Sequence, residues 1–150
     1  MSARERKLPS SVNPSDAGAV RKAFHDIGTR SVPAARVNIS ASAEGAFAAN
    51  TRQISVTVVD LQEQRWEGRW IVAVYLTTAA DADPDGTGNT VTFEANTVNL
   101  EEFVANSGYL LLTNANGVAV FNVAIVGAAS RVVAAVVLGQ IQESDPLAWA

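Results

Sequence analysis

Residues 109–123 read Tyr-Leu-Leu-Leu-Thr-Asn-Ala-Asn-Gly-Val-Ala-Val-Phe-Asn-Val. Two apolar runs, 109–113 and 118–125, flank a turn that contains Asn116-Gly117, and both residues of this pair tolerate a positive φ. Aliphatic, β-branched and aromatic residues dominate the runs, which is typical of strands. The stretch therefore predicts two β-strands joined as a hairpin, and it favours an all-β fold.

The same kind of pattern continues on both sides of this stretch. Five further segments are predicted to be strands on the same grounds, namely 36–40, 53–58, 70–76, 90–94 and 131–138. The segment 70–76 is apolar almost throughout, which predicts a strand buried on both faces. About seven short strands separated by turn residues are typical of an antiparallel β-sandwich. Strands do not alternate with helical segments, which argues against a parallel nucleotide-binding sheet.

Charge divides the chain into two unequal parts. Residues 1–36 hold seven basic and three acidic side chains, hence +4, whereas residues 37–150 hold four and twelve, hence −8. A basic leader on an acidic body is either a solvated tail or an arm that docks on an acidic surface, such as the body of a neighbouring copy. Nucleic-acid binding is disfavoured, because the basic groups are few and an acidic body repels phosphate.

The leader also has its own pattern. Prolines in the first 14 residues predict an extended arm, and Ser15 can cap a short α-helix over residues 16–27. One stripe at helical spacing holds Ala17, Val20, Phe24 and Ile27. Twelve residues are marginal for an isolated helix, so we expect this helix to pack on the body or on another subunit.

Composition leaves little for catalysis. The 150 residues include no cysteine and a single histidine, so disulfides, cysteine-bound zinc and a multi-histidine metal site within one chain are excluded. His25 and Asp26 are adjacent, which places them about 100° apart on a helix and prevents a working acid–base pair. We therefore predict a protein that is not an enzyme and binds no cofactor. The sequence also lacks an apolar run of 18 residues and a secretory signal. We therefore expect neither a membrane span nor export.

One acidic segment resembles the start of a calcium loop. Asp81, Asp83 and Asp85 precede Gly86 in the order Asp-x-Asp-x-Asp-Gly, but the twelfth position is Thr92 rather than a glutamate that could bind bidentately. These aspartates are weak metal candidates, and a solvated turn between strands is the favoured interpretation.

Aromatic residues offer two further alternatives. Trp66, Tyr75 or Tyr109 could form a carbohydrate platform, whereas Trp70, which opens the most apolar run, is predicted to belong to the core. Trp149 follows Pro146 near the end of the chain, where a tryptophan either packs into a neighbouring surface or frays.

Three segments resemble the immunoglobulin-like domains found in structural proteins of tailed bacteriophages. The segments are Ile54–Asp60, Trp70–Thr77 and Tyr109–Val123, and the resemblance spans Ile54 to Leu138, a little over half of the chain. It implies an Ig-like antiparallel sandwich that acts as a non-catalytic adhesion or cementing module. We therefore divide the chain into an anchoring arm with the helix (1–34), the Ig-like sandwich (35–142) and a C-terminal tail (143–150).

The resemblance implies a minor capsid or head decoration protein of the virion, assembled in the bacterial cytoplasm. Its partners would be the major capsid protein, other virion proteins and further copies of the chain, with neither nucleic acid nor membrane. The residues expected to make these contacts are Arg4, Arg6, Lys7, Val20, Phe24, Ile27 and Trp149. Two alternatives stay open: a tail-tip, portal-vertex or fibre component, and a carbohydrate-binding sandwich.

Overall fold

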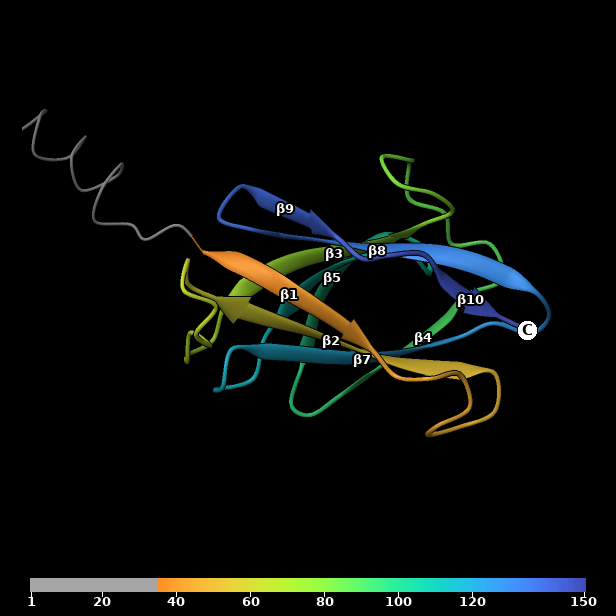
Figure 1. The fold of residues 1–150 in the computed structure, drawn as a ribbon, viewed down its shortest axis with the longest axis horizontal. Coiled ribbons are helices and arrows are strands. Elements are labelled where there is room, and N and C mark those ends of the chain that lie inside the picture. Colours follow the sequence, from red (N-terminus) through yellow and green to blue (C-terminus); the bar gives the residue numbers. More distant parts are fainter. Residues whose placement is uncertain (1–34) are drawn as a thin grey trace, which may run out of the picture. The chain divides into compact units, whose positions relative to one another are not determined.

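The computed structural model describes residues 35–150. The described chain is a β-sandwich of two antiparallel sheets (Figure 1). The extended arm and the helix expected before residue 35 lie outside the described residues.

The two sheets differ in size. The first has the order β1 (Arg36–Ala41), β2 (Thr51–Val59), β7 (Val118–Ala124) and β4 (Thr90–Glu94). The second has the order β10 (Leu147–Trp149), β8 (Ala129–Val137), β3 (Ile71–Thr77), β6 (Gly108–Leu112) and β5 (Val98–Val104), and β9 (Gln140–Glu143) also pairs with β8. Every pairing between strands is antiparallel.

The core lies between the sheets and follows the alternation of the strands. The first sheet contributes Ile54, Val56 and Val58 from β2 and Ala119, Phe121 and Val123 from β7, while the second contributes Val72, Val74 and Leu76 from β3, Tyr109 and Leu111 from β6, and Val133, Ala135 and Val137 from β8. Most of these side chains are β-branched, which restricts their rotamers and suits them to a pleated surface.

All seven predicted segments coincide with strands, but the count of seven is wrong because the described chain has ten. Strand β5 was missed since its sequence alternates poorly and all but its last residue are exposed. Strands β9 and β10 were missed because both are short; β10 lies within the predicted tail, where it pairs with residues 129–131 of β8.

Burial of strand β3 on both faces is also a wrong prediction. Val72, Val74 and Leu76 are buried, but Ile71 is 56% exposed. Ala73 and Tyr75, which alternate with the buried residues, are only half-buried. The strand therefore has one face in the core and an apolar face on the outside.

The Asn-Gly turn does not make the expected hairpin, because β6 and β7 belong to different sheets. Asn114 organises the turn: its side-chain Oδ1 accepts hydrogen bonds from the backbone N–H groups of Asn116 and Val118. Gly117, at φ 76°, lies so close to the carbonyl of Trp66 that a Cβ atom would be 2.2 Å from that oxygen. The turn thus carries the chain across the core from one sheet to the other.

Candidate functional site

The acidic loop is organised by its own backbone and by an arginine. Asp85 Oδ1 accepts a hydrogen bond of 2.8 Å from the Thr87 N–H, which lowers the pKa of the Asp85 carboxyl. Asp85 N–H donates to the Leu76 carbonyl, and a Cβ on Gly86 would lie 2.0 Å from the carbonyl oxygen of Ala105. Asp85 and Gly86 of the motif that resembles a calcium loop therefore serve turn geometry in this structure.

Arg131 fixes the same loop to β8. Its side chain is buried, with Nε donating to Asn89 Oδ1 at 3.1 Å and Nη2 to the Thr87 carbonyl at 2.6 Å. Asn89 in turn donates to the carbonyls of Asp85 and Asn106. Asp81 and Asp83 are exposed, and within residues 35–150 no three His, Cys, Asp or Glu side chains are placed to share a metal ion.

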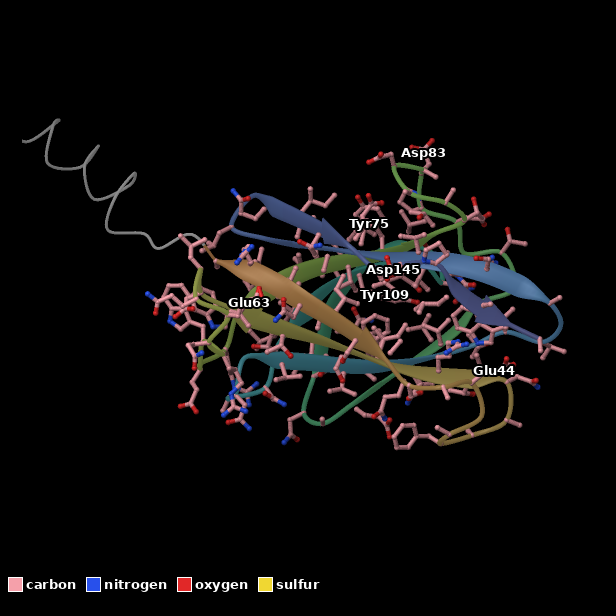
Figure 2. All side chains as sticks on the ribbon, in the orientation of Figure 1. Glu44, Glu63, Tyr75, Asp83, Tyr109 and Asp145 are labelled. Carbon is pink, nitrogen blue, oxygen red and sulfur yellow. The ribbon has the colours of Figure 1, made fainter. Side chains whose placement is uncertain are left out.

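The aromatic residues do not share one platform. Tyr109 is 3% exposed and lies between the sheets, whereas Tyr75 lies on the outside of the second sheet (Figure 2). Trp66 and Trp70 pack edge to face with centroids 4.9 Å apart, and the Trp70 indole donates to the Trp66 carbonyl. Both tryptophans are half-buried against the core, so the prediction for Trp70 holds in part.

Trp149 is not available as a contact residue, which corrects the expectation for this position. It is 3% exposed, belongs to the core, and is carried by β10 at the edge of the second sheet. The guanidinium carbon of Arg52 lies 5.5 Å from the centroid of its ring. The remaining predicted contact residues, from Arg4 to Ile27, lie outside the described residues.

The outside of the second sheet is the surface best suited to contact another protein, because it is apolar. Residues directly opposite one another on neighbouring strands share a face. One row across three strands is Val98, Leu112 and Ile71, and the next row across four strands is Leu110, Ala73, Val136 and Ile141. Both rows are apolar across these strands, and the second row ends at Glu101 on β5, which is opposite Leu110.

Two aromatic residues extend these rows. Tyr75 lies beyond Ala73 on β3, and the Phe103 ring covers Gly108 so closely that a Cβ there would be 2.5 Å from it. We call the resulting surface the outer apolar face, made up of Ile71, Ala73, Tyr75, Val98, Phe103, Leu110, Leu112, Val136 and Ile141. Its rim is open to solvent, with Val98 43% and Ile141 58% exposed. The lack of polar alternation in residues 70–76 was the sequence signal for this surface.

The outside of the first sheet is the opposite in character. Its strands present polar side chains, among them Asn38, Ser40, Gln53, Ser55, Thr57, Thr92, Glu94 and Asn122. The Glu94 carboxylate accepts hydrogen bonds from Gln53 at 2.7 Å and from Asn122 at 2.6 Å. An antiparallel sheet that faces water has this pattern, so the apolar outside of the second sheet is a specific departure from it.

Acidic groups border the outer apolar face. Glu101 on β5 is opposite Leu110, and Glu143 on β9 is opposite Ala134. The Asp81 backbone N–H donates to the Glu143 carboxylate at 2.9 Å, which holds the acidic loop beside that edge. Burial raises the pKa of Tyr75, and the negative charges of Glu143 and Asp81 raise it further. Arg69, at the other end of β3, donates to the Thr113 carbonyl.

A polar cleft of about 470 Å³ lies between strands β1 and β9. Its lining includes Asn38, Ser144 and Asp145, together with Arg36 and Glu63. The last two form an exposed ion pair with an N–O distance of 3.4 Å. The cleft presents no apolar surface comparable to the outer apolar face.

No protein-family model, curated protein or solved structure matches this chain. Among the described residues, no helix is long and apolar enough to cross a membrane. The outer apolar face and its acidic border are therefore the features on which a functional interpretation depends.

Proposed function

We propose that the chain is a non-catalytic structural protein of a tailed-phage particle, and that it works by packing its outer apolar face against other subunits. The single observation that carries the proposal is this face, which spans strands β5, β6, β3, β8 and β9. Monomeric proteins rarely expose an apolar surface of several contiguous strands, whereas subunit contacts commonly do. Burial of such a surface stabilises an assembly without any chemical step.

The order of the strands supports an Ig-like sandwich. Constant-type Ig domains have the sheet orders A-B-E-D and G-F-C. Here β1-β2-β7-β4 takes the first order, and the second follows as β9 or β10, then β8, then β3. The hairpin of β5 and β6 is inserted between the fourth and fifth Ig strands and extends the second sheet beyond β3. Four of the nine residues of the outer apolar face come from this insertion, namely Val98, Phe103, Leu110 and Leu112.

Within such a particle we infer a minor capsid or head decoration role. The basic leader with Arg4, Arg6 and Lys7 would anchor the chain to the major capsid protein or to sister copies. A tail-tip, portal-vertex or fibre location is the alternative within the same class, and copy number separates the two. Hundreds of copies per particle indicate a decoration protein, whereas three, six or twelve indicate a tail or portal vertex.

The test is incorporation into particles. A tagged full-length chain is produced during phage growth, particles are purified on a density gradient, and copies are counted by quantitative mass spectrometry. We expect the wild-type chain to co-purify at a fixed copy number, and the Ile71→Asp variant to fall at least fivefold. The matched control is Ser40→Asp, an outward position on the first sheet. Normal occupancy of Ile71→Asp would refute the proposal.

A further inference from the structure

A partner for the outer apolar face has to match its acidic border as well as its apolar surface. Residues 35–150 hold five basic and twelve acidic side chains, hence −7. Glu101 borders one edge of the face, and Glu143 with Asp81 borders the other. Two such faces brought together would oppose like charges, so an apolar partner with positive charge fits this surface better than a second body does.

The chain itself contains a segment with this chemistry. The leader, residues 1–34, holds six basic and three acidic side chains, hence +3. Its sequence predicts an apolar stripe that includes Val20, Phe24 and Ile27, and Arg21 and Lys22 lie between the first two of these. An amphipathic segment of this kind binds by laying its apolar stripe on an apolar surface.

We propose that the leader of one copy docks on the outer apolar face of another copy. Val20, Phe24 and Ile27 would cover the central rows around Leu110 and Ala73. The basic residues would lie toward the acidic border. This inference rests on the proposed function, because a contact between copies is what a particle subunit requires, and it adds which segment covers the face.

Photo-crosslinking of the full chain tests the contact directly. Phe24 is replaced by benzoylphenylalanine, which keeps an aromatic ring, and ¹⁴N and ¹⁵N copies are mixed before irradiation. We expect mixed-isotope crosslinks whose peptides map to β3, β5, β6, β8 or β9. Crosslinks that map to the first sheet, or that join only copies of one isotope, would overturn the inference. The control is the same replacement at Phe47, an exposed position between β1 and β2, which we expect to give no crosslink to the outer apolar face.

Self-association measured by sedimentation velocity gives an independent readout. We expect Ile71→Asp and Phe24→Asp each to weaken association of the full chain about tenfold or more, which corresponds to about 1.4 kcal/mol. Ser40→Asp is expected to stay within about twofold of the wild type. Association should also weaken as salt rises, because the charged border is screened. A full chain that stays monomeric, or equal weakening by Ser40→Asp, would contradict the inference.

The two proposals can fail separately. If Ile71→Asp is lost from particles but position 24 crosslinks elsewhere, the face is an assembly surface and the leader is not its partner. If Ile71→Asp weakens association while Phe24→Asp does not, a second body covers the face. Circular dichroism and a second variant, Ile141→Asp on β9, distinguish a loss of contact from a loss of folding.

Discussion

Arg52 on β2 donates hydrogen bonds to the strand that carries Trp149, and so connects the two sheets at one end of the sandwich. Its Nε and Nη2 donate to the Ala148 carbonyl at 2.9 and 2.7 Å, and its Nη1 donates to the Ser42 carbonyl at 2.7 Å. The guanidinium lies 5.5 Å from the centroid of the Trp149 ring, within the range of a cation–π interaction. The Arg52 side chain thus connects β10 to the first sheet, and the Ala150 N–H adds a hydrogen bond of 2.9 Å to the Glu44 carboxylate between β1 and β2.

Replacing Arg52 tests this connection between the sheets. We expect Arg52→Met to lower the free energy of unfolding by about 2 to 3 kcal/mol, because it removes charge-assisted hydrogen bonds and the cation–π contact. Trp149 fluorescence should shift toward the exposed value as β10 detaches. Arg65→Met is the matched control, since Arg65 makes one exposed ion pair with Glu67 at 3.1 Å and should change stability by less than about 1 kcal/mol. Equal losses of unfolding free energy in both variants would contradict the role of Arg52 in connecting the sheets.

Arg131 is a second structural arginine, and it is buried rather than exposed. Truncation in Arg131→Met leaves the Thr87 carbonyl and Asn89 Oδ1 without their donors, and a buried group without a partner costs about 1 to 3 kcal/mol. We expect a total loss of about 3 kcal/mol in chemical denaturation, with increased protease cleavage in the loop at residues 81–89. Arg36→Met, which removes an exposed pair, should lose less than about 1 kcal/mol. Unchanged cleavage of the loop would argue against this function of Arg131.

Strands were predictable from the sequence, but the way they pair was not. Alternation of apolar residues and short runs of apolar, β-branched residues are local signals, and together they located the seven predicted segments. The Asn-Gly turn is equally local, yet whether it closes a hairpin or crosses the core depends on a distant contact. Here that contact is between Gly117 and the Trp66 carbonyl, and no spacing in the sequence reports it.

The candidate surface was partly visible in the sequence. Residues 70–76 lack polar residues on either face, which indicates two apolar faces but not what covers them. The second contribution comes from β5, whose register shifts between Asn99 and Glu101 and between Glu102 and Val104. Such irregularities break the alternation by which a strand is predicted. The environment of Trp149 was not predictable from the sequence either, because the Arg52 side chain near its ring lies 97 positions earlier in the chain.

Tyr109 gives the protein a defined response to alkaline pH. Burial raises the pKa of its phenol above the ordinary value of 10.0, and the hydrogen bond and negative charge of Glu102 raise it further. Because the folded pKa exceeds the unfolded one, the stability that the neutral phenol contributes is complete below pH 10 and is lost as the pH rises toward the folded pKa.

This response can be measured as tyrosinate absorbance at 295 nm. The chain has two tyrosines, and the pKa of Tyr75 is also raised. At pH 10, where an ordinary phenol is about half ionised, we expect little absorbance from the folded protein and about half-ionisation in denaturant. The free energy of unfolding of Tyr109→Phe should fall less steeply above pH 10 than that of the wild type. Half-ionisation in native buffer would contradict the burial of Tyr109.

Calcium tests the turn interpretation of the acidic loop. The Asp85 carboxylate accepts the Thr87 N–H, and the loop is fixed by Arg131 and Asn89, so the turn is stabilised without a cation. We expect millimolar calcium to shift the melting temperature by less than about 1 °C, because a ligand stabilises a fold only in proportion to its binding. Magnesium at the same concentration controls for ionic strength.

Different effects of substitutions at Leu111 and Ile71 test which side of the second sheet is the core. Leu111 is fully buried, so Leu111→Ala should lower the free energy of unfolding by about 2 to 5 kcal/mol through lost burial and a residual cavity. Ile71 is more than half exposed on the outer apolar face, so Ile71→Ser should change stability by less than about 1 kcal/mol while reducing self-association. A large loss of stability in Ile71→Ser would mean that the isolated domain already buries this side chain. The outer apolar face would then be part of the fold and not a surface for a partner.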